Sequence, residues 1–282
     1  MPHHHHHGVA LYKSAIELTN IGHGKHTDDS DKIILPPNLR LQENTVEALI
    51  QHIYPGLSQL QPQAPLHQYF SERMILSSRN DNVDDLNTLM LNSFPGEEQI
   101  FFTEDTVAND RPDEGKLMYP AEYLNSINCS GLPLAKLRLK IGCPVMVLRN
   151  LFPAEGVCNG TRGIVTKMST CVIEIELLSE EFRGKKVFIP RITLNPSESQ
   201  VPFKLERRQF PLKLCFAIMI NKSQGQLVTY IGVDMKSLVF THGQFYVAVS
   251  RVRSVNNIKV IWDEKLGDGI TKNVVYPEIL LN

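Results

Sequence analysis

Residues 221–225 (Asn-Lys-Ser-Gln-Gly) place an amide, a cation, a hydroxyl, a second amide and a flexible glycine in consecutive positions. They follow the apolar run 214–220, which predicts a buried strand. Uninterrupted apolar strands are typical of the centre of an α/β sheet, and ligands usually bind at the carboxyl ends of such strands. The turn 221–225 is therefore a candidate for contacting a ligand.

A second polar surface is predicted on a helix that begins at Gly243. Gln244 and Arg251 lie seven positions apart, so they share one face of that helix. This face presents a guanidinium group. The opposite, apolar stripe consists of four residues at helical spacing, Phe245, Ala248, Val249 and Val252.

Arg79 occupies a junction of the same kind. The apolar run 73–77 predicts a short strand, and the pattern of residues 81–93 predicts a helix. An arginine at the junction of two lobes can neutralise the charge on the γ-phosphate of a nucleotide during phosphoryl transfer. The alternative is that Arg79 pairs with a nearby carboxylate, such as that of Asp81.

The composition is that of an ordinary globular protein. The 282 residues are 42% hydrophobic and 21% charged, and they suffice for one large domain or two small ones. Neither a membrane-spanning apolar run nor a signal-peptide pattern is present. The five cysteines include no C-x-x-C pair, so neither a zinc site nor a disulfide framework is expected, and a reducing compartment fits best.

The formal net charge of -1 conceals an asymmetry along the chain. Residues 1–115 carry an excess of ten acidic side chains, and residues 116–282 carry an excess of nine basic ones. The stretch 183–213 alone holds eight basic and two acidic residues. Such a basic half suits binding to phosphates through counterion release, whereas the alternative is a solvated surface without a partner.

The middle of the chain is rich in short strand patterns. The dipeptide Asn159-Gly160 predicts a tight hairpin turn, and residues 97–119 predict no regular element. The α/β pattern resumes at Phe210, so a β-rich insertion, which suggests a small barrel, interrupts an α/β layer. The predicted strands are 145–149, 163–168, 171–177 and 186–194 in the insertion, and 230–233 and 258–262 after it.

Several blocks of the sequence together resemble a known family. Residues 216–226 and 242–251 are similar to motifs five and six of superfamily-one DNA helicases, and blocks 77–83, 139–151 and 158–163 precede them in family order. The resemblance is to the PIF-one-like (petite integration frequency) group, which includes helicases carried by Helitron transposons. It implies an α/β fold: the RecA-like second motor domain of a P-loop helicase with an inserted SH3-like β-barrel.

The resemblance also implies a division of the chain. His3–His7 look like an affinity tag, so the first segment is treated as tag-like or irregular. The expected segments are 1–35 (N-terminal segment), 36–118 (first part of the motor domain), 119–205 (inserted β-rich domain), 206–265 (second part of the motor domain) and 266–282 (C-terminal tail).

The family roles carry over to matching positions. Arg79 and Arg251 would be catalytic, approaching ATP held mainly by the first motor domain. Contacts with the nucleotide are implied for Gln224, Gly225, Gln244 and Arg251. Contacts with DNA are implied for Asn159, Thr161, Arg162, Asn221, Lys222, Ser223, Arg207 and Arg208, within a basic track that adds Arg183, Lys185, Lys186, Arg191 and Lys204.

The residues that hydrolyse ATP in this family are not found. No Walker A loop, Walker B pair or motif-three block precedes Pro36, and the run 21–31 lacks the G-x-x-x-x-G-K-[ST] spacing. Hydrolysis needs the phosphate loop, its lysine and the Mg²⁺ ligands. The first motor domain is therefore expected to be absent, with ATP and Mg²⁺ bound only when that lobe is supplied, and the chain alone is expected to be inactive.

Three functions stay open at this point. The first is the C-terminal part of an ATP-dependent 5′-to-3′ DNA helicase that acts in replication, recombination or repair, including telomere maintenance. The second is a non-enzymatic relic of a transposon helicase that binds single-stranded DNA, and the third is an inactive fragment that folds poorly. The expected partners are single-stranded DNA and the first motor lobe, in cis or in trans, without a membrane. The expected location is intracellular, with the nucleus favoured over the mitochondrion.

Overall fold

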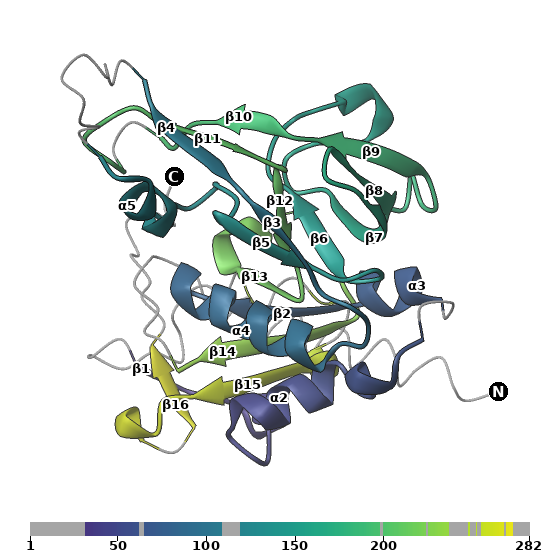
Figure 1. Ribbon diagram of the computed structural model, residues 1–282. Helices are drawn as coiled ribbons and strands as arrows, with labels where there is room; N and C mark the ends of the chain where they lie inside the picture. Colours follow the sequence, from purple (N-terminus) through teal and green to yellow (C-terminus); the bar gives the residue numbers. More distant parts are fainter. Residues whose placement is uncertain are drawn as a thin grey trace, which may run out of the picture. The chain divides into compact units, whose positions relative to one another are not determined.

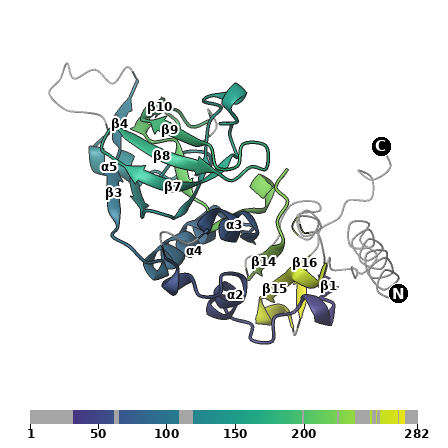
Figure 2. The same cartoon turned by 90° about the vertical axis from the view of Figure 1, so that its right-hand side faces the viewer.

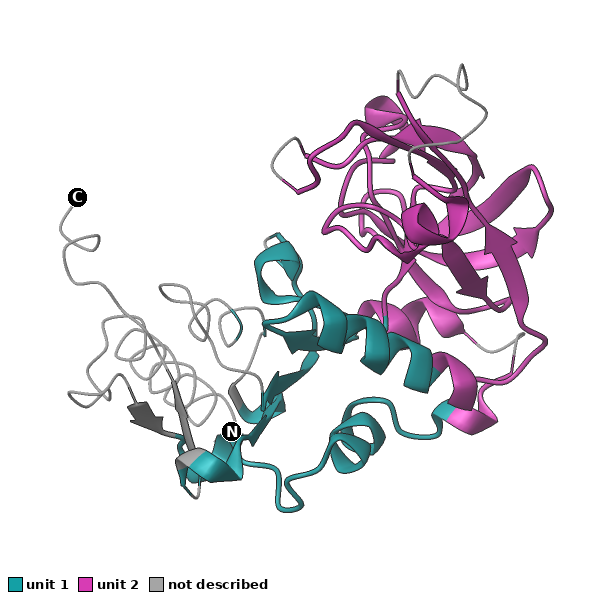
Figure 3. Ribbon diagram, turned by 60° about the vertical axis from the view of Figure 1, so that its left-hand side comes forward, with its two compact units in different colours: residues 1–57, 72–90, 216–282 teal, residues 58–71, 91–215 magenta. Residues whose placement is uncertain are grey.

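A computed structural model of the chain contains two compact units (Figure 3). Unit 1 combines residues 1–57, 72–90 and 216–282, and unit 2 combines residues 58–71 and 91–215. The chain therefore crosses between the units after residues 57, 71, 90 and 215. The structure describes residues 32–61, 65–108, 119–197, 200–223, 225–236, 248, 252, 255–267 and 269–272.

Unit 1 is built on a sheet of four parallel strands (Figure 1). In sheet order these are β13 (Ala217–Met219), β2 (Arg73–Ser77), β14 (Tyr230–Met235) and β15 (Ile258–Trp262). Nearly all of their side chains are buried, as expected for parallel strands with both faces covered. Because the strands are parallel, their carboxyl ends lie at one edge of the sheet.

Helix α2 (Val46–Ile53) packs closely against this sheet. Its first turn is capped by Thr45, whose hydroxyl accepts a hydrogen bond from a backbone N–H of that turn. Gly232 of β14 makes the close approach possible, since a Cβ there would lie within 2.9 Å of side-chain atoms of Leu49 and Ile53. The helix and the strand are therefore matched at a position where only glycine fits.

Helix α4 (Asn80–Ser93) follows β2 and holds the first strand of the sheet. The buried amide of Asn87 donates to the carbonyl of Ala217 at 3.0 Å and accepts from its N–H at 2.9 Å. The smaller elements of unit 1 are β1 (Lys32–Ile34), which pairs with β16 (Ile270–Lys272), and the 3-10 helices η1 (Pro37–Leu39), η5 (Ile220–Ser223), η6 (Val255–Asn257) and η7 (Glu264–Leu266).

Unit 2 contains a five-stranded antiparallel sheet. In sheet order its strands are β12 (Leu212–Leu214), β6 (Pro144–Val147), β7 (Arg162–Met168), β8 (Val172–Leu177) and β9 (Lys186–Pro190). Between β7 and β8 the register shifts at Thr166, which marks a β-bulge.

Two smaller sheets and two helices complete unit 2 (Figure 2). The three-stranded sheet consists of β10 (Ile192–Leu194), β11 (Leu205–Gln209) and β4 (Glu104–Val107), and the two-stranded sheet of β3 (Gln99–Phe102) and β5 (Lys136–Leu139). The helices are α3 (Leu66–Ser71) and α5 (Ala121–Ser126), with short 3-10 turns η2 (Leu57–Gln59), at the unit boundary, and η4 (Pro153–Glu155).

A buried ion pair holds the three-stranded sheet together. Arg207 of β11 donates from Nε and Nη2 to the two carboxylate oxygens of Asp105 in β4, both at 2.8 Å, and both side chains are fully buried. The same guanidinium also donates to the carbonyls of Pro133 and Leu124. Because all of its donor nitrogens are engaged inside the protein, the prediction that Arg207 contacts DNA is wrong.

The predicted elements agree with the structure where an apolar run decides them. Strands 73–77 and 258–262 and the helix that ends at residue 93 are confirmed. The run 214–220 is divided, since β12 ends at Leu214 and β13 begins at Ala217 in the other unit. Residues 97–119 contain β3 and β4, although their pattern predicts no element.

The β-rich unit extends beyond residues 119–205 on both sides. It includes residues 58–71, whose helix α3 contacts β7, and it includes β4 and β12, because β4 pairs with β11 and β12 pairs with β6. These limits follow from strand pairing between segments that are about 100 and about 65 residues apart, which no local pattern reveals.

All five cysteines are free thiols. Burial raises the pKa of Cys143 to about 12 and that of Cys215 to about 11, so both stay protonated near neutral pH. Within the described ranges, no helix has the length and apolar character needed to cross a bilayer. In the same part of the chain, no three His, Cys, Asp or Glu side chains converge as metal ligands.

We expect Arg207→Ala to destabilise the protein by about 3–5 kcal/mol, because it leaves a buried carboxylate on Asp105 without a counter-charge. Urea unfolding followed by circular dichroism measures this loss. The double variant Arg207→Met with Asp105→Leu should recover most of it, since both charges are removed. The matched control is Arg208→Ala, which changes the adjacent, exposed arginine and should leave the midpoint nearly unchanged. Equal losses for Arg207 and Arg208 would contradict the assignment.

Candidate functional site

The turn after β13 presents two polar side chains at the carboxyl edge of the parallel sheet. Asn221 and Lys222 lie in η5 and are exposed. Gly225 has φ +78°, a conformation that glycine adopts without strain. The turn is therefore tight, and its two exposed side chains can meet a ligand.

Ser223 closes this turn from inside. It is buried, and its hydroxyl donates to the carbonyl of Ile220 at 2.5 Å. A hydroxyl has a single proton to donate. While this hydrogen bond persists, Ser223 cannot donate to a DNA phosphate, and its contribution is to the shape of the turn.

Arg79 follows the neighbouring strand β2 and is paired with Asp81. Its Nε and Nη2 donate to the two carboxylate oxygens at 3.1 and 2.6 Å. The hydrogen bond from Arg79 holds the pKa of Asp81 below its usual range. Both side chains remain more than half exposed, so the pair is screened by water and can exchange partners. Arg79 is predicted either to contact a nucleotide phosphate or to pair with a carboxylate, and this structure shows the pair with Asp81.

An amide bridge fixes the same edge of the sheet. Asn82 Nδ2 donates to Ser77 Oγ at 2.7 Å and to Asp234 Oδ2 at 3.0 Å. Ser77 ends β2 and Asp234 lies near the end of β14, and both are buried. The other oxygen of Asp234 accepts the N–H of Lys236. The bridge therefore connects the first turn of α4, which follows Arg79, to two adjacent strands.

The sequence does not reveal this bridge directly. The sequence features that hint at the bridge are Ser77 and Asp234, polar residues at or near the ends of two apolar strands, and Asn82 in the first turn of a helix. Only the pairing of β2 with β14 brings the three side chains together, across 152 positions of sequence between Asn82 and Asp234.

Three of the predicted nucleotide contacts, Gln224, Gln244 and Arg251, lie outside the described residues. Within the same predicted helix, Ala248 and Val252 are described, and both are buried, as the apolar stripe predicts. Val252 also forms an isolated parallel bridge with Val228.

In unit 2, the turn before β7 is ordered by its own side chains. The hydroxyl of Thr161 donates to the carbonyl of Gly156 at 3.1 Å and accepts the N–H of Cys158 at 3.0 Å. Asn159 is exposed, and its N–H is bound by Asn150 Oδ1. The turn therefore leaves the Asn159 side chain facing solvent and uses the hydroxyl of Thr161 internally.

The basic residues of unit 2 divide into structural and exposed ones. Arg162 is buried and donates to the carbonyls of Phe70 and Ser71 at the end of α3, so the prediction that it contacts DNA is wrong. Arg191 is half-buried and donates to the carbonyls of Thr170 and Phe102. Of the basic side chains predicted to form the DNA track, those that remain exposed are Arg183, Lys185, Lys186, Lys204 and Arg208.

The chain is similar in sequence to the Pif1 group of DNA helicases. The family model for the 2B domain of DNA helicase Pif1 matches residues 122–168. The chain is 30% identical to an ATP-dependent DNA helicase PIF1 of Xenopus laevis over 66% of its own length and 27% of the relative's. It is 36% identical to an ATP-dependent DNA helicase Pif1 of Bdellovibrio bacteriovorus over 47% of its own length and 29% of the relative's.

Solved structures show the same fold. A Bacteroides Pif1 bound to ssDNA gives a TM-score of 0.56 at 24% identity, covering 95% of this chain and 52% of that one. Pif1 helicase from Candida albicans gives 0.56 at 21% identity, covering 89% and 53%. The α/β fold therefore matches that of these two solved Pif1 chains. The chain is similar in sequence to the Pif1 helicases, and it spans under a third of the two curated relatives and about half of the two solved chains.

We expect Asn82→Ala to lower stability by about 1–3 kcal/mol, because Ser77 and the buried carboxylate of Asp234 each lose a hydrogen-bond donor. Thermal or urea unfolding measures the effect. Thr88→Ala, at an exposed position of the same helix, is the matched control and should change stability little. If both variants unfold at the same denaturant concentration as the parent, the bridge does not hold this edge.

Proposed function

We propose that this chain supplies the second motor lobe and the 2B domain of an ATP-dependent 5′-to-3′ DNA helicase. The observation that carries the proposal is the shared carboxyl edge of β13 and β2. Met219 pairs with Ser77 in the sheet, so the turn with Asn221 and Lys222 and the junction with Arg79 follow adjacent parallel strands. Ligands of open α/β sheets bind at this edge.

The two exposed polar side chains of the turn suit a DNA backbone. Lys222 offers a cation and Asn221 an amide, and both types of group contact phosphates in protein–DNA complexes. In unit 2, Asn159 and Arg208 are exposed and available for further contacts. We assign the five-stranded sheet of unit 2 to an SH3-like barrel inserted in the motor domain, as the resemblance implies.

The proposed contact between Arg79 and the nucleotide requires that Arg79 exchange its partner Asp81 for a phosphate. The exposed pair of Arg79 with Asp81 releases the guanidinium when a more highly charged phosphate is offered. Gly225, Gln224, Gln244 and Arg251 complete the contacts implied by the family. Bound ATP with Mg²⁺ would supply the energy of unwinding. A first motor lobe, in cis or in trans, contributes the phosphate loop and the Mg²⁺ ligands.

The cellular processes proposed for this chain are those implied by its resemblance to the PIF-one-like DNA helicases. DNA unwinding by such a helicase serves replication, recombination or repair, with telomere maintenance and transposition of Helitron elements as specific cases. We expect an intracellular location for the protein, with the nucleus favoured over the mitochondrion.

A second candidate function is a non-enzymatic module that binds single-stranded DNA, derived from a transposon helicase. It is favoured by the independence of unit 2, which has its own buried core and keeps exposed basic residues on β11 and beside β9. Single-strand affinity that ignores ATP when the first motor lobe is present would favour this module over the helicase.

Lys222→Ala should weaken binding of the chain to single-stranded DNA and reduce the slope of log affinity against log salt by about 0.7, the value of one phosphate contact. Fluorescence anisotropy with labelled oligothymidine across a salt series measures both quantities. Lys265→Ala, an exposed lysine of unit 1 in η7, is the matched control and should leave the slope unchanged. An unchanged slope for Lys222→Ala would remove Lys222 from the DNA contacts.

With a first motor lobe supplied, DNA-stimulated ATP hydrolysis should appear, and Arg251→Ala should lower its turnover by about 10³-fold or more, as for other arginines that stabilise the transferring phosphate. Steady-state ATPase assays with and without single-stranded DNA measure it. Arg253→Ala, two positions further on, is the control. If Arg251→Ala and Arg253→Ala lower turnover equally, or if neither does, the catalytic role of Arg251 is contradicted.

A further inference from the structure

Three aromatic rings gather on unit 2, and one of them, Phe203, directly precedes Lys204 of the predicted basic track. The ring centroids of Tyr119 and Phe203 lie 4.3 Å apart, and those of Tyr119 and Tyr123 lie 6.1 Å apart with an interplanar angle of 25°. Tyr123 belongs to α5 and is 47% exposed. We call these three residues the aromatic shelf.

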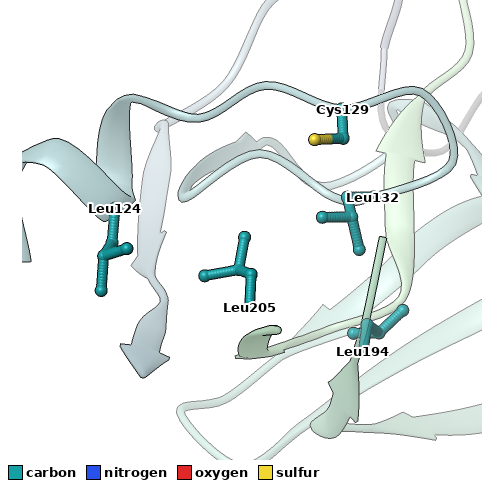
Figure 4. Packing of buried hydrophobic residues seen from close by; sticks show 5 residues of the cluster. All are labelled: Leu124, Cys129, Leu132, Leu194 and Leu205. Carbon is teal, nitrogen blue, oxygen red and sulfur yellow. The ribbon is translucent and has the colours of Figure 1, made fainter. Parts of the chain in front are cut away.

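Two rings of the shelf pack against a cluster of buried hydrophobic residues, whose five buried members are shown in Figure 4. Tyr119 and Phe203 are partly buried and pack against its side chains, which come from α5, β10, β11 and the segment that joins α5 to β5. Its five buried members are Leu124, Cys129, Leu132, Leu194 and Leu205. Because Tyr119 and Phe203 pack on a buried cluster, these two rings are held in place before any ligand arrives, which reduces the side-chain entropy lost when one binds.

A hollow of about 640 Å³ adjoins the shelf at Phe203. Its size falls within the range of roughly 300–1,000 Å³ that is typical of sites for small organic groups. Apolar walls come from residues that include Val201 and Leu205, and the amide of Asn195 and the hydroxyl of Ser197 contribute polar groups. Arg149 donates to the carbonyl of Asn195 and so ties that wall to the body of unit 2.

The charge of the hollow favours an anionic ligand. Among the described residues that line it, Lys204 is the only charged one, and it is exposed. A ligand with a flat ring, hydrogen-bonding edges and a negative charge would meet the aromatic shelf, Asn195 or Ser197, and Lys204 together. A nucleotide unit has these three properties.

We propose that the aromatic shelf and the adjoining hollow hold one unpaired nucleobase of single-stranded DNA, with its phosphate near Lys204. This inference rests on the proposed function and adds a stacking contact to it. Tyr123 offers an open ring face, since nearly half of its surface is exposed, and every base has a face that can stack. The contact is therefore insensitive to sequence, as a translocating protein requires.

Proline-rich peptides also dock in grooves lined by aromatic side chains. Lys204 is what favours the nucleotide, since its ammonium group can pair with a phosphate, whereas a polyproline helix carries no charge. A peptide is therefore the competing outcome of the experiment.

The test compares oligothymidine with a strand of equal length and charge that carries abasic sites, by fluorescence anisotropy on the full chain. Tyr123→Ala should weaken binding of oligothymidine about 5- to 150-fold, which corresponds to the ~1–3 kcal/mol of one base stacked on an aromatic side chain. It should leave binding of the abasic strand unchanged. Tyr123→Trp should restore the affinity, and Lys204→Ala should weaken both strands equally.

Phe188→Ala is the matched control, because this phenylalanine is 59% exposed on β9, in another sheet of unit 2. Equal losses on both strands for Tyr123→Ala, or none, would overturn the stacking contact. Displacement of oligothymidine by an oligoproline peptide, abolished by Tyr123→Ala, would assign the shelf to a peptide. Loss of binding in Lys222→Ala with no effect of Tyr123→Ala refutes only this inference, whereas no binding by the parent chain at low salt refutes the proposed DNA site as well.

Discussion

The pairing of β2 with strands on both of its sides is the constraint on which unit 1 depends. Its partners come from residues 217–219 and 230–235, far along the chain, and the backbone ladder places Ser77 beside both Met219 and Asp234. Asn87 and the hydroxyl of Tyr54 hold the start of β13 in place through the backbone of Ala217 and Phe216. The two polar junctions of the candidate site therefore meet because the strands are parallel and neighbouring.

Unit 2 shows why a count of basic residues overstates a nucleic-acid surface. Arg162 and Arg207 are buried, and each satisfies backbone carbonyls that would otherwise lack a donor. Burial of a guanidinium requires that its donors be bound, which both of these arginines achieve. The side chains left for phosphates are those on turns and outward strand positions, such as Arg208 and Lys186.

Local pattern predicts this fold only where the partners are local. Strands 73–77 and 258–262 are evident as apolar runs between polar turns. By contrast, the sequence of β4 suggests an acidic loop rather than a strand. The arginine that neutralises its Asp105 lies 102 residues away, so no local pattern indicates that this carboxylate is buried. For Arg79, the sequence offers both a phosphate and Asp81, and a choice between them depends on solvent exposure and on the ligand.

The order of the elements along the chain has a consequence for synthesis on the ribosome. β2 ends at Ser77, but its first partner begins at Ala217, about 140 residues later. At roughly 5–20 residues per second, this strand emerges about 7–30 seconds before it can be paired. Nearly all of unit 2 is made in that interval, so it can close first. An unpaired apolar strand is prone to aggregation during this interval, so residues 73–77 are a segment that a chaperone on the nascent chain would protect.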